Sequence, residues 1–394
     1  MRTIQSTGAN SQVAVRPKQT VHDTGKRHCK PGRPVHDCLG SAQRIGLGNA
    51  DSGVMKSGQA KYKHVPVELH GDGRFVLSGK DFVSAYVTTH KAGKLKLKVT
   101  DALELLRECS LCPRRCGVNR LDNARRVCGV GRRARVSSAF PHLGEEDCLR
   151  GWRGSGTIFF TGCNLRCVFC QNYEISQLGE GDEVDSEKLA GLMLKLQAAG
   201  CHNINFVTPT HVVPQILEAL LIAVEAGLRL PLVYNSGGYD NPDVIRLLEG
   251  VVDIYMPDFK LWTPELCAKY LTARDYADAA RSAIKIMHQQ TGVLRVDESG
   301  LALRGVLIRH LVMPGMLDET AHIMRWLATE LSPDTFVNVM DQYRPEHKVL
   351  HDPQYTAINR RITNAELTRA IELARAAGLW RFDTRWRAVV PVLF

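Results

Sequence analysis

From residue 157 onward, short apolar runs alternate with amphipathic segments of helical period. The apolar runs predict strands at residues 157–161, 203–207, 231–234, 252–256, 305–312 and 335–340. The amphipathic segments predict helices at residues 186–199, 212–226, 242–248, 276–289, 318–331 and 364–377. Six strand–helix units in series indicate an α/β fold, a parallel sheet with helical crossovers. Both an incomplete (β/α) barrel and a doubly wound open sheet satisfy this pattern.

Upstream of residue 157 the apolar pattern weakens. Residues 64–108 predict a short ordered lead-in that ends in an amphipathic helix over 99–107, with Leu103 and Leu106 on its apolar face. Residues 109–154 are rich in Cys, Arg and Gly and lack apolar periodicity, so we expect no regular structure there.

Positive charge is concentrated at the N-terminus. Residues 1–63 contain eleven Lys and Arg, three Asp and no Glu, so they carry +8 of the formal net charge of +10. They also lack Phe and Trp, and this composition predicts a disordered basic tail. We therefore divide the chain into this tail, a Cys-rich lead-in at 64–154, a core at 155–383 and a C-terminal extension at 384–394.

Composition also limits the partners of the chain. The residues after the basic tail are nearly neutral, whereas a phosphate-binding surface needs clustered Lys and Arg, so we expect no nucleic-acid partner. No run of about eighteen apolar residues is present, so we expect no membrane span. No apolar signal segment precedes the core, and we expect a cytoplasmic protein in which residues 1–54 are either a dispensable tail or lie upstream of a true start at Met55.

Seven of the twelve cysteines fall into two tight clusters. Clustered cysteines without a secretion signal are typical of thiolate metal ligands in a reducing compartment. The clusters are Cys109/Cys112/Cys116/Cys128 and Cys163/Cys167/Cys170.

The downstream triad has the spacing C-x3-C-x2-C and follows the first predicted strand directly. Its position is therefore a βα loop at the C-terminal end of the sheet, where α/β folds place their chemistry. Three thiolates leave one iron of a [4Fe–4S] cluster without a protein ligand, whereas electron carriers usually fill all four. An open metal position indicates a site for substrate. The alternative is a structural zinc with a distant fourth ligand.

At the triad the chain resembles a known family. The run from Gly154 to Ser176, GSGTIFFTGCNLRCVFCQNYEIS, is similar to the radical S-adenosylmethionine (SAM) proteins related to pyruvate formate-lyase activating enzyme. The resemblance covers roughly residues 85–383 and includes the segments 109–116 and 341–345. It implies a partial (β/α)6 barrel, a [4Fe–4S] cluster at the triad, and SAM bound at the open iron.

The resemblance also implies a reaction. The cluster cleaves SAM reductively to a 5′-deoxyadenosyl radical, which abstracts hydrogen from a substrate that the sequence does not identify. Activation of a glycyl-radical enzyme is one option, and modification of another protein, peptide or small molecule is another. A reducing electron donor such as flavodoxin or ferredoxin is implied as a partner, and a protein substrate is a further option.

Three residues near the end of the fourth predicted strand are candidates for the SAM pocket. Alternation places Met256, Asp258 and Lys260 on one face. The resemblance implies that they lie beside the SAM carboxylate, and the structural alternative is a buried Asp–Lys pair. Asn235 and Ser236, at the end of the third strand, align with polar SAM-site positions of the resembled enzymes.

Further pocket candidates lie elsewhere along the core. Arg309 resembles an arginine that pairs with the SAM carboxylate, and its alternative is an ion pair on the outer face of the barrel. Phe169, the aromatic residue before the last cysteine of the triad, is a further cofactor-binding candidate. Residues 208–211, TPTH, depart from the Gly-Gly-Glu-Pro that radical SAM proteins often have at this point. We expect His211 to be a structural residue at the start of a helix. Met340, Gln342 and Tyr343 are expected to line the cavity.

The upstream cysteines have the spacing C-x2-C-x3-C-x11-C. Four thiolates can close a tetrahedral zinc site or fill a second [4Fe–4S] cluster, and an unliganded loop is the third alternative. Activating enzymes with two clusters carry their extra cysteines after the triad, yet no cysteine lies between Cys170 and Cys201. The rival function for the whole chain is a zinc or iron–sulfur protein without SAM chemistry, acting in regulation or electron transfer.

Overall fold

The computed structural model describes residues 73–383. The predicted basic tail at 1–63 and the C-terminal extension at 384–394 therefore lie outside the described residues. The division into lead-in and core stays a prediction, because the described parts of both belong to one compact unit.

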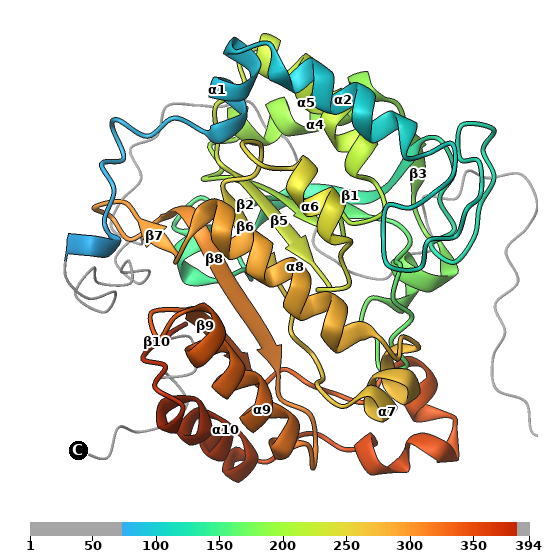
Figure 1. Cartoon of the computed structure of the whole chain (residues 1–394), viewed down its shortest axis with the longest axis vertical. Coiled ribbons are helices and arrows are strands. Elements are labelled where there is room, and N and C mark those ends of the chain that lie inside the picture. The colour runs from blue at the N-terminus through green and yellow to red at the C-terminus, as the bar shows by residue number, and fades with distance from the viewer. Residues whose placement is uncertain (1–72, 384–394) are drawn as a thin grey trace, which may run out of the picture. The chain divides into compact units, whose positions relative to one another are not determined.

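A mostly parallel sheet forms the centre of the described chain (Figure 1). All six predicted strands are present and pair in parallel, in the order β2-β4-β5-β6-β8-β9. Their bounds are β2 Ser155–Phe160, β4 Ile204–Val207, β5 Leu232–Ser236, β6 Ile254–Pro257, β8 Ala302–Leu311 and β9 Phe336–Met340. Sequential parallel strands need crossover helices, which is what the alternating pattern predicted.

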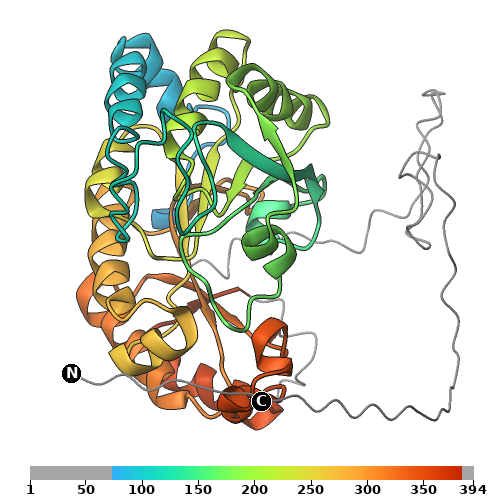
Figure 2. The ribbon, with the colours of Figure 1, turned by 90° about the vertical axis from the view of Figure 1, so that its right-hand side faces the viewer.

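Helices cross over between these strands and lie on the outside of the sheet (Figures 1 and 2). The crossovers contain α4 Ser186–Ala198, α5 Val213–Glu225, α6 Pro242–Leu247, α8 Tyr276–Thr291 and α9 Leu317–Trp326, and α10 Asn364–Ala376 follows β9. Their starts have local causes. The Asp185 side chain accepts from the Lys188 N–H, and Thr363 forms a capping box with Glu366.

Short elements fill the connections. The short helical segments are α7 Pro264–Leu266, the 3-10 segments Gly73–Phe75, His347–Leu350 and Pro353–Ile358, and the π-helical turns Glu174–Leu178, Cys267–Leu271 and Leu327–Leu331. The short strands are β3 Asp182–Val184, β7 Arg295–Val296 and β10 Arg381–Phe382. The predicted helix 318–331 is thus α9 continued by a π-helical turn.

The lead-in differs from its prediction in two ways. The helix expected at 99–107 is α2, Lys94–Glu104, which begins a turn earlier and follows α1, Ala85–Lys91. Segment 109–154, expected to be irregular, contains β1, Ala134–His142, and α3, Asp147–Arg150. Strand β1 pairs antiparallel with both β2 and β3, so its structure comes from its partners rather than from an apolar alternation of its own.

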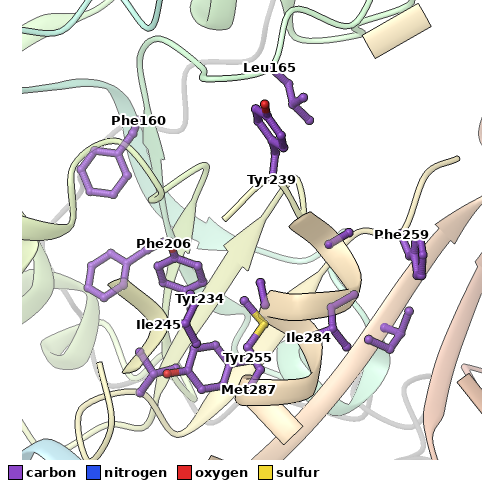
Figure 3. Packing of buried hydrophobic residues seen from close by; sticks show 14 of the residues in the cluster. Phe160, Leu165, Phe206, Tyr234, Tyr239, Ile245, Tyr255, Phe259, Ile284 and Met287 are labelled. Atoms are coloured by element: carbon purple, nitrogen blue, oxygen red, sulfur yellow. The ribbon is translucent and has the colours of Figure 1, made fainter. Parts of the chain in front are cut away.

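The two faces of the sheet bury different sets of side chains. Tyr234 and Tyr255 face the helices and pack near Ile245 of α6 and Met287 of α8 (Figure 3). Their strand neighbours point the other way, into a smaller apolar cluster on the inner face. That cluster contains Val233, Ile254, Met256, Leu307 and Phe336. Candidate site residues that alternate in step with this inner set therefore also lie on the inner face of the sheet. No helix among residues 73–383 is long and apolar enough to cross a membrane.

Candidate functional site

The cysteine triad lies on the loop that leaves β2. Cys163, Cys167 and Cys170 are all partly buried and carry free thiols. The thiols are close enough to interact electrostatically: burial, and then the neighbouring thiols, raise the pKa of Cys163 above its ordinary value. Burial raises the pKa of Cys167 to about 12, although the nearby Lys260 charge opposes the shift. Iron binding deprotonates such thiols.

Contacts from several elements hold this loop in place. The Asn164 side chain donates to the Tyr239 carbonyl at 2.5 Å, after β5. The Val168 N–H donates to the Tyr270 carbonyl at 2.9 Å, and Lys348 N–H donates to the Val168 carbonyl at 3.1 Å. The loop therefore has backbone or side-chain partners after β5, β6 and β9.

Phe169, the aromatic cofactor-binding candidate, is buried in this loop. Its ring packs edge-on against Tyr343, with the ring centroids 5.9 Å apart. Gln171 donates to the Gln342 carbonyl at 3.0 Å. The structure thus brings Phe169 together with two of the residues expected to line the cavity.

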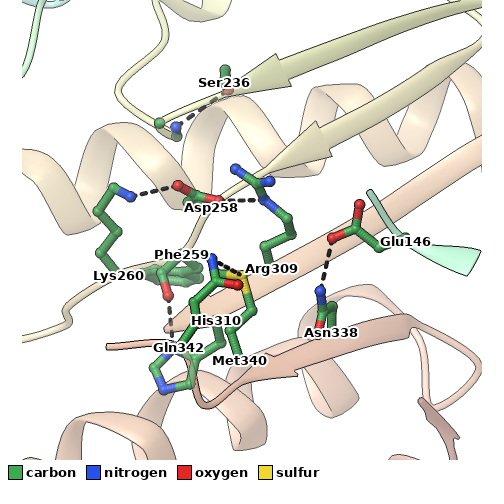
Figure 4. A network of polar contacts seen from close by, with 12 residues as sticks. Glu146, Ser236, Asp258, Phe259, Lys260, Arg309, His310, Asn338, Met340 and Gln342 are labelled. Carbon is green, nitrogen blue, oxygen red and sulfur yellow. Dashed lines mark hydrogen bonds and ion pairs between the residues drawn. The ribbon is translucent and has the colours of Figure 1, made fainter. Parts of the chain in front are cut away.

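A buried ion triad lies beside the cysteines, at the ends of β6 and β8 (Figure 4). Asp258 accepts from Arg309 Nε at 2.7 Å and contacts the Lys260 ammonium. Burial alone would raise the pKa of Asp258, but the charges of Arg309 and Lys260 lower it below its ordinary value. One alternative for Arg309 was an ion pair on the outer face of the barrel. Arg309 does form an ion pair, but on the inner face of the sheet, and its partner Asp258 is itself a predicted pocket residue.

Acidic residues that the sequence did not single out lie on the other side of Arg309. Glu145 and Glu146 are buried and act electrostatically on the Arg309 guanidinium. Glu146 accepts from Asn338 of β9 at 2.7 Å (Figure 4). Glu145 contacts His142 at 3.1 Å. They were missed because they lie in a segment expected to be irregular. Two consecutive buried acidic residues would have indicated a site, but the sequence does not show which residues are buried.

The remaining predicted pocket residues divide between the two faces. Asn235 and Met256 are register partners on β5 and β6, and both are buried on the inner face. Ser236 has the opposite orientation, and its hydroxyl donates to Asp240 at 2.5 Å. Asp240 also accepts from Thr210 and Tyr234, at 2.6 and 2.9 Å. The Ser236 hydroxyl therefore supports the end of β5.

The turn after β4 has a conformation that glycine favours. Thr208 has a φ of 61°, in the left-handed region. His211 follows, fully buried, and its Nε2–H donates to the Thr161 carbonyl at 2.9 Å, just before the triad. Burial lowers the pKa of His211 to about 4, so the ring is neutral near pH 7. His211 is structural, as expected, and it connects the β4 turn to the triad loop.

The upstream cysteines are also brought together. Cys109 and Cys112 are buried, while Cys116 and Cys128 are partly exposed. Burial, and to a smaller extent the thiols of the other three cysteines, raise the pKa of Cys112 to about 12. Four residues spread over the segment between α2 and β1 therefore form one thiol cluster.

The donor set of the triad fits a [4Fe–4S] cluster. Within residues 73–383, no three Cys, His, Asp or Glu side chains form a ready-made site for a single metal ion. The thiolates of a [4Fe–4S] cluster bind different irons, so they lie farther apart than the ligands of one ion. Three thiols that lie near one another beside buried cations can each bind a different iron. The fourth iron of the cluster would then have no protein ligand.

Comparison with known proteins gives two results at the level of sequence. The profile of the Radical SAM superfamily matches residues 157–327. Uncharacterized protein MJ0674 of Methanocaldococcus jannaschii is 37% identical over 298 residues, which cover 73% of this chain and 80% of that protein.

Similar solved structures match more weakly. The crystal structure of Streptococcus suis SuiB bound to precursor peptide SuiA is 14% identical with a TM-score of 0.39, and the match covers 56% of this chain and 46% of that one. The crystal structure of methylornithine synthase (PylB) is 16% identical with a TM-score of 0.38, covering 57% and 70% of the two chains. This chain therefore spans less than half of the length of SuiB.

Proposed function

This chain belongs to the radical SAM superfamily and uses a [4Fe–4S] cluster and SAM, and we propose that Cys163, Cys167 and Cys170 are the ligands of that cluster. When bound, the cluster supplies one electron that cleaves SAM to a 5′-deoxyadenosyl radical, which abstracts hydrogen from the substrate. One observation carries the proposal: three mutually interacting thiols lie directly after β2, beside the buried cation Lys260.

The ion triad is suited to hold the carboxylate of SAM. Arg309 uses only Nε for Asp258, and within residues 73–383 its two terminal nitrogens have no hydrogen-bond partner. A guanidinium presents a planar fork that matches a carboxylate in bidentate geometry. Asp258 keeps Arg309 and Lys260 oriented, because it contacts both. We assign Arg309 to the SAM carboxylate and Asp258 to the positioning of Arg309.

Asn235 and Met256 complete the inner wall next to this group. They are register partners near the C-terminal ends of β5 and β6, and Met256 lies two residues before Asp258. The parallel strands β2 to β9, with their outer helices, support a partial (β/α)6 barrel that opens at these ends. Phe169 closes the loop side of the pocket.

The substrate and donor are proposed at the level of class. The resemblance to pyruvate formate-lyase activating enzyme supports a protein substrate, of which a glycyl-radical enzyme is one option. The electron comes from a low-potential carrier such as flavodoxin or ferredoxin. An oxygen-sensitive cluster and ten free cysteines among residues 73–383 are suited to the reducing cytoplasm.

The test is electron paramagnetic resonance of the anaerobically reconstituted and reduced protein, with and without SAM. Direct binding of SAM to an open iron changes the signal of the reduced cluster. We expect this change in the wild type and its loss in Cys163→Ala, Cys167→Ala and Cys170→Ala. Cys201→Ala is the matched control, because Cys201 is a buried thiol outside both cysteine clusters. A wild-type signal that SAM leaves unchanged would overturn the assignment.

A further inference from the structure

The four upstream cysteines lie on a compact knuckle between α2 and β1. The Cys109 N–H donates to the Val118 carbonyl at 3.0 Å, and the Gly117 N–H donates back to the Cys109 carbonyl at 3.1 Å. The Arg115 N–H closes a turn on the Cys112 carbonyl at 3.0 Å. This backbone pairing closes residues 109–118, with three of the cysteines, into a tight loop without regular secondary structure.

Hydrogen-bond donors are directed at these sulfurs. The backbone N–H groups of Arg114 and Val130 act to lower the pKa of the Cys112 and Cys128 thiols, against the larger effect of burial. Arg120 Nη1 lies 3.9 Å from Cys109 Sγ. Donors of this kind stabilise thiolates, and around iron–sulfur clusters they help to set the reduction potential. An unliganded loop does not require them.

Arg120 adds a charge argument. Its side chain is almost completely buried and donates to the carbonyls of Gly131 and His211 at 2.8–3.1 Å. Among residues 73–383 no carboxylate forms an ion pair with it. A buried cation needs a nearby negative charge, and the sulfurs of Cys109 and Cys128 lie near enough to supply one. Metal-bound thiolates at these positions would therefore compensate the buried charge of Arg120.

The knuckle packs directly against the triad loop. A Cβ on Gly162, the residue before Cys163, would lie 2.3 Å from the Cys128 carbonyl oxygen. Arg166 Nη1 donates to the Val127 carbonyl at 3.3 Å, and Arg114 Nε donates to the Asn164 carbonyl at 3.0 Å. Two thiol sites thus adjoin through their backbones. The rate of electron tunnelling falls steeply with distance, so two adjoining redox sites can exchange electrons quickly.

We propose that Cys109, Cys112, Cys116 and Cys128 hold a second [4Fe–4S] cluster, which relays single electrons to the triad. The intervals x2 and x3 of the first three cysteines are those of the triad in reverse order. Three thiolates in eight residues with a fourth farther on resemble iron–sulfur runs more than the paired ligands of zinc knuckles. All four irons have a protein ligand, as in electron carriers.

The electron balance of the relay is simple. A reduced one-electron carrier of the flavodoxin or ferredoxin class gives one electron to the upstream cluster, whose charge state falls from 2+ to 1+. That electron passes to the triad cluster and is consumed in SAM cleavage, and the upstream cluster returns to 2+. The relay step rests on the proposed function of the triad, whereas the metal assignment does not.

The metal assignment is tested by iron and sulfide analysis of the full chain. The wild type is expected to bind about eight irons, and Cys163→Ala/Cys167→Ala/Cys170→Ala to retain about four irons and four sulfides with the signal of a reduced cluster. Cys112→Ala/Cys116→Ala is expected to retain about four at the triad. Stoichiometric zinc in the triad variant, or loss of all its iron and sulfide while it stays folded, overturns the proposal.

Arg120 offers a second readout. Removing the buried positive charge disfavours the additional electron, so Arg120→Gln is expected to lower the reduction potential of the upstream cluster. Arg125→Gln is the matched control, because Arg125 lies on the same segment but is exposed and pairs with Glu183. An unchanged potential in folded Arg120→Gln contradicts the placement of the cluster beside Arg120.

The relay is tested by the ratio of two rates of 5′-deoxyadenosine formation, one with reduced flavodoxin and one with dithionite. Dithionite is small enough to reach the triad directly, so the flavodoxin rate of Cys112→Ala is expected to fall at least about tenfold more than its dithionite rate. If the variant loses the same factor in both rates, the result contradicts a relay and indicates that the upstream site is structural. A wild type with about eight irons but no product would instead contradict the triad's function and leave the metal assignment standing.

Discussion

Asp258 is the carboxylate that contacts both buried cations of the site. It accepts from Arg309 and contacts Lys260, and all three side chains are less than one-fifth exposed. Neither cation has another ion-pair partner within residues 73–383 at contact distance. Removing the carboxylate takes away the contact ion-pair partner of two buried cations, which costs more than losing an exposed pair.

Asp258→Asn is therefore expected to lower the free energy of unfolding by about 3 kcal/mol. The measurement is urea unfolding at pH 7, in parallel with SAM binding, which should weaken because Arg309 loses its orientation. Asp243→Asn is the control: Asp243 pairs with Arg246 on the surface, and its loss should cost less than about 1 kcal/mol. Equal costs for the two variants would show that the triad is not a buried ion network.

His211 predicts a pH dependence. Its pKa is lowered to about 4 by burial, whereas an unfolded histidine titrates near its ordinary value of about 6.5. Between these values the unfolded chain binds one proton more than the folded chain, so this residue makes stability fall as the pH falls from about 6.5 to about 4.

The check is the thermal midpoint of the holoprotein from pH 7.5 to pH 5.5. His211→Gln should reduce the loss of stability toward pH 5.5, because the titrating group is gone. His351→Gln, at an exposed position, should leave the pH profile unchanged. The same profile in wild type and His211→Gln would contradict the burial argument.

Residue by residue, the sequence located the groups that share a recognisable spacing or a strand face. The triad, the Asp258–Lys260 pair and Arg309 lie close together in the structure. Glu146, Asn338 and Arg120 were not found, because nothing local distinguishes them. Their roles arise from burial and from partners that are 11 to 192 positions away along the chain.

At the scale of elements, the sequence predicted those that carry their own pattern. Six strands and six crossover helices alternate clearly, and their observed bounds differ from the predicted ones by a few residues. Strand β1 could not be predicted, because half-exposed residues and Pro141 weaken its pattern and its hydrogen bonds come from β2 and β3. Local propensity is a weak guide where a neighbouring strand decides the structure.

The junction between β2 and the triad loop depends on one glycine. Gly162 has a φ of 86°, and an added Cβ would meet the Cys128 carbonyl oxygen. Gly162→Ala is therefore expected to cost at least about 1–3 kcal/mol and to lower the iron content of reconstituted protein. Thermal unfolding and iron analysis are the measurements.

Gly191→Ala is the matched control for Gly162→Ala. Gly191 lies within α4, where an added Cβ meets no atom within 4 Å. Alanine in this helix should raise stability by about 0.5–1 kcal/mol and leave the iron content unchanged. If Gly162→Ala behaves like Gly191→Ala, the close contact between the knuckle and the triad loop is wrong.

At the scale of the whole molecule, the predicted lead-in contacts the predicted core at two separate places. Asp253, before β6, accepts from the Ala85 N–H at the start of α1 at 2.8 Å. The knuckle of the lead-in packs on the loop that carries the triad. The formal positive charge lies mainly in residues 1–63, outside the described part, and the rest of the chain is nearly neutral. A nucleic-acid regulator would need a basic surface on the folded part, so this balance favours the enzyme.

Cleavage of SAM at the triad cluster is tested by analysis of the reaction product. The full chain is reconstituted anaerobically with iron and sulfide, SAM and dithionite are added, and 5′-deoxyadenosine is quantified beside Cys167→Ala. We predict product in the wild type and none above background in the variant. Product formed equally by both, or a wild type that binds zinc instead of iron at the triad, would contradict the account.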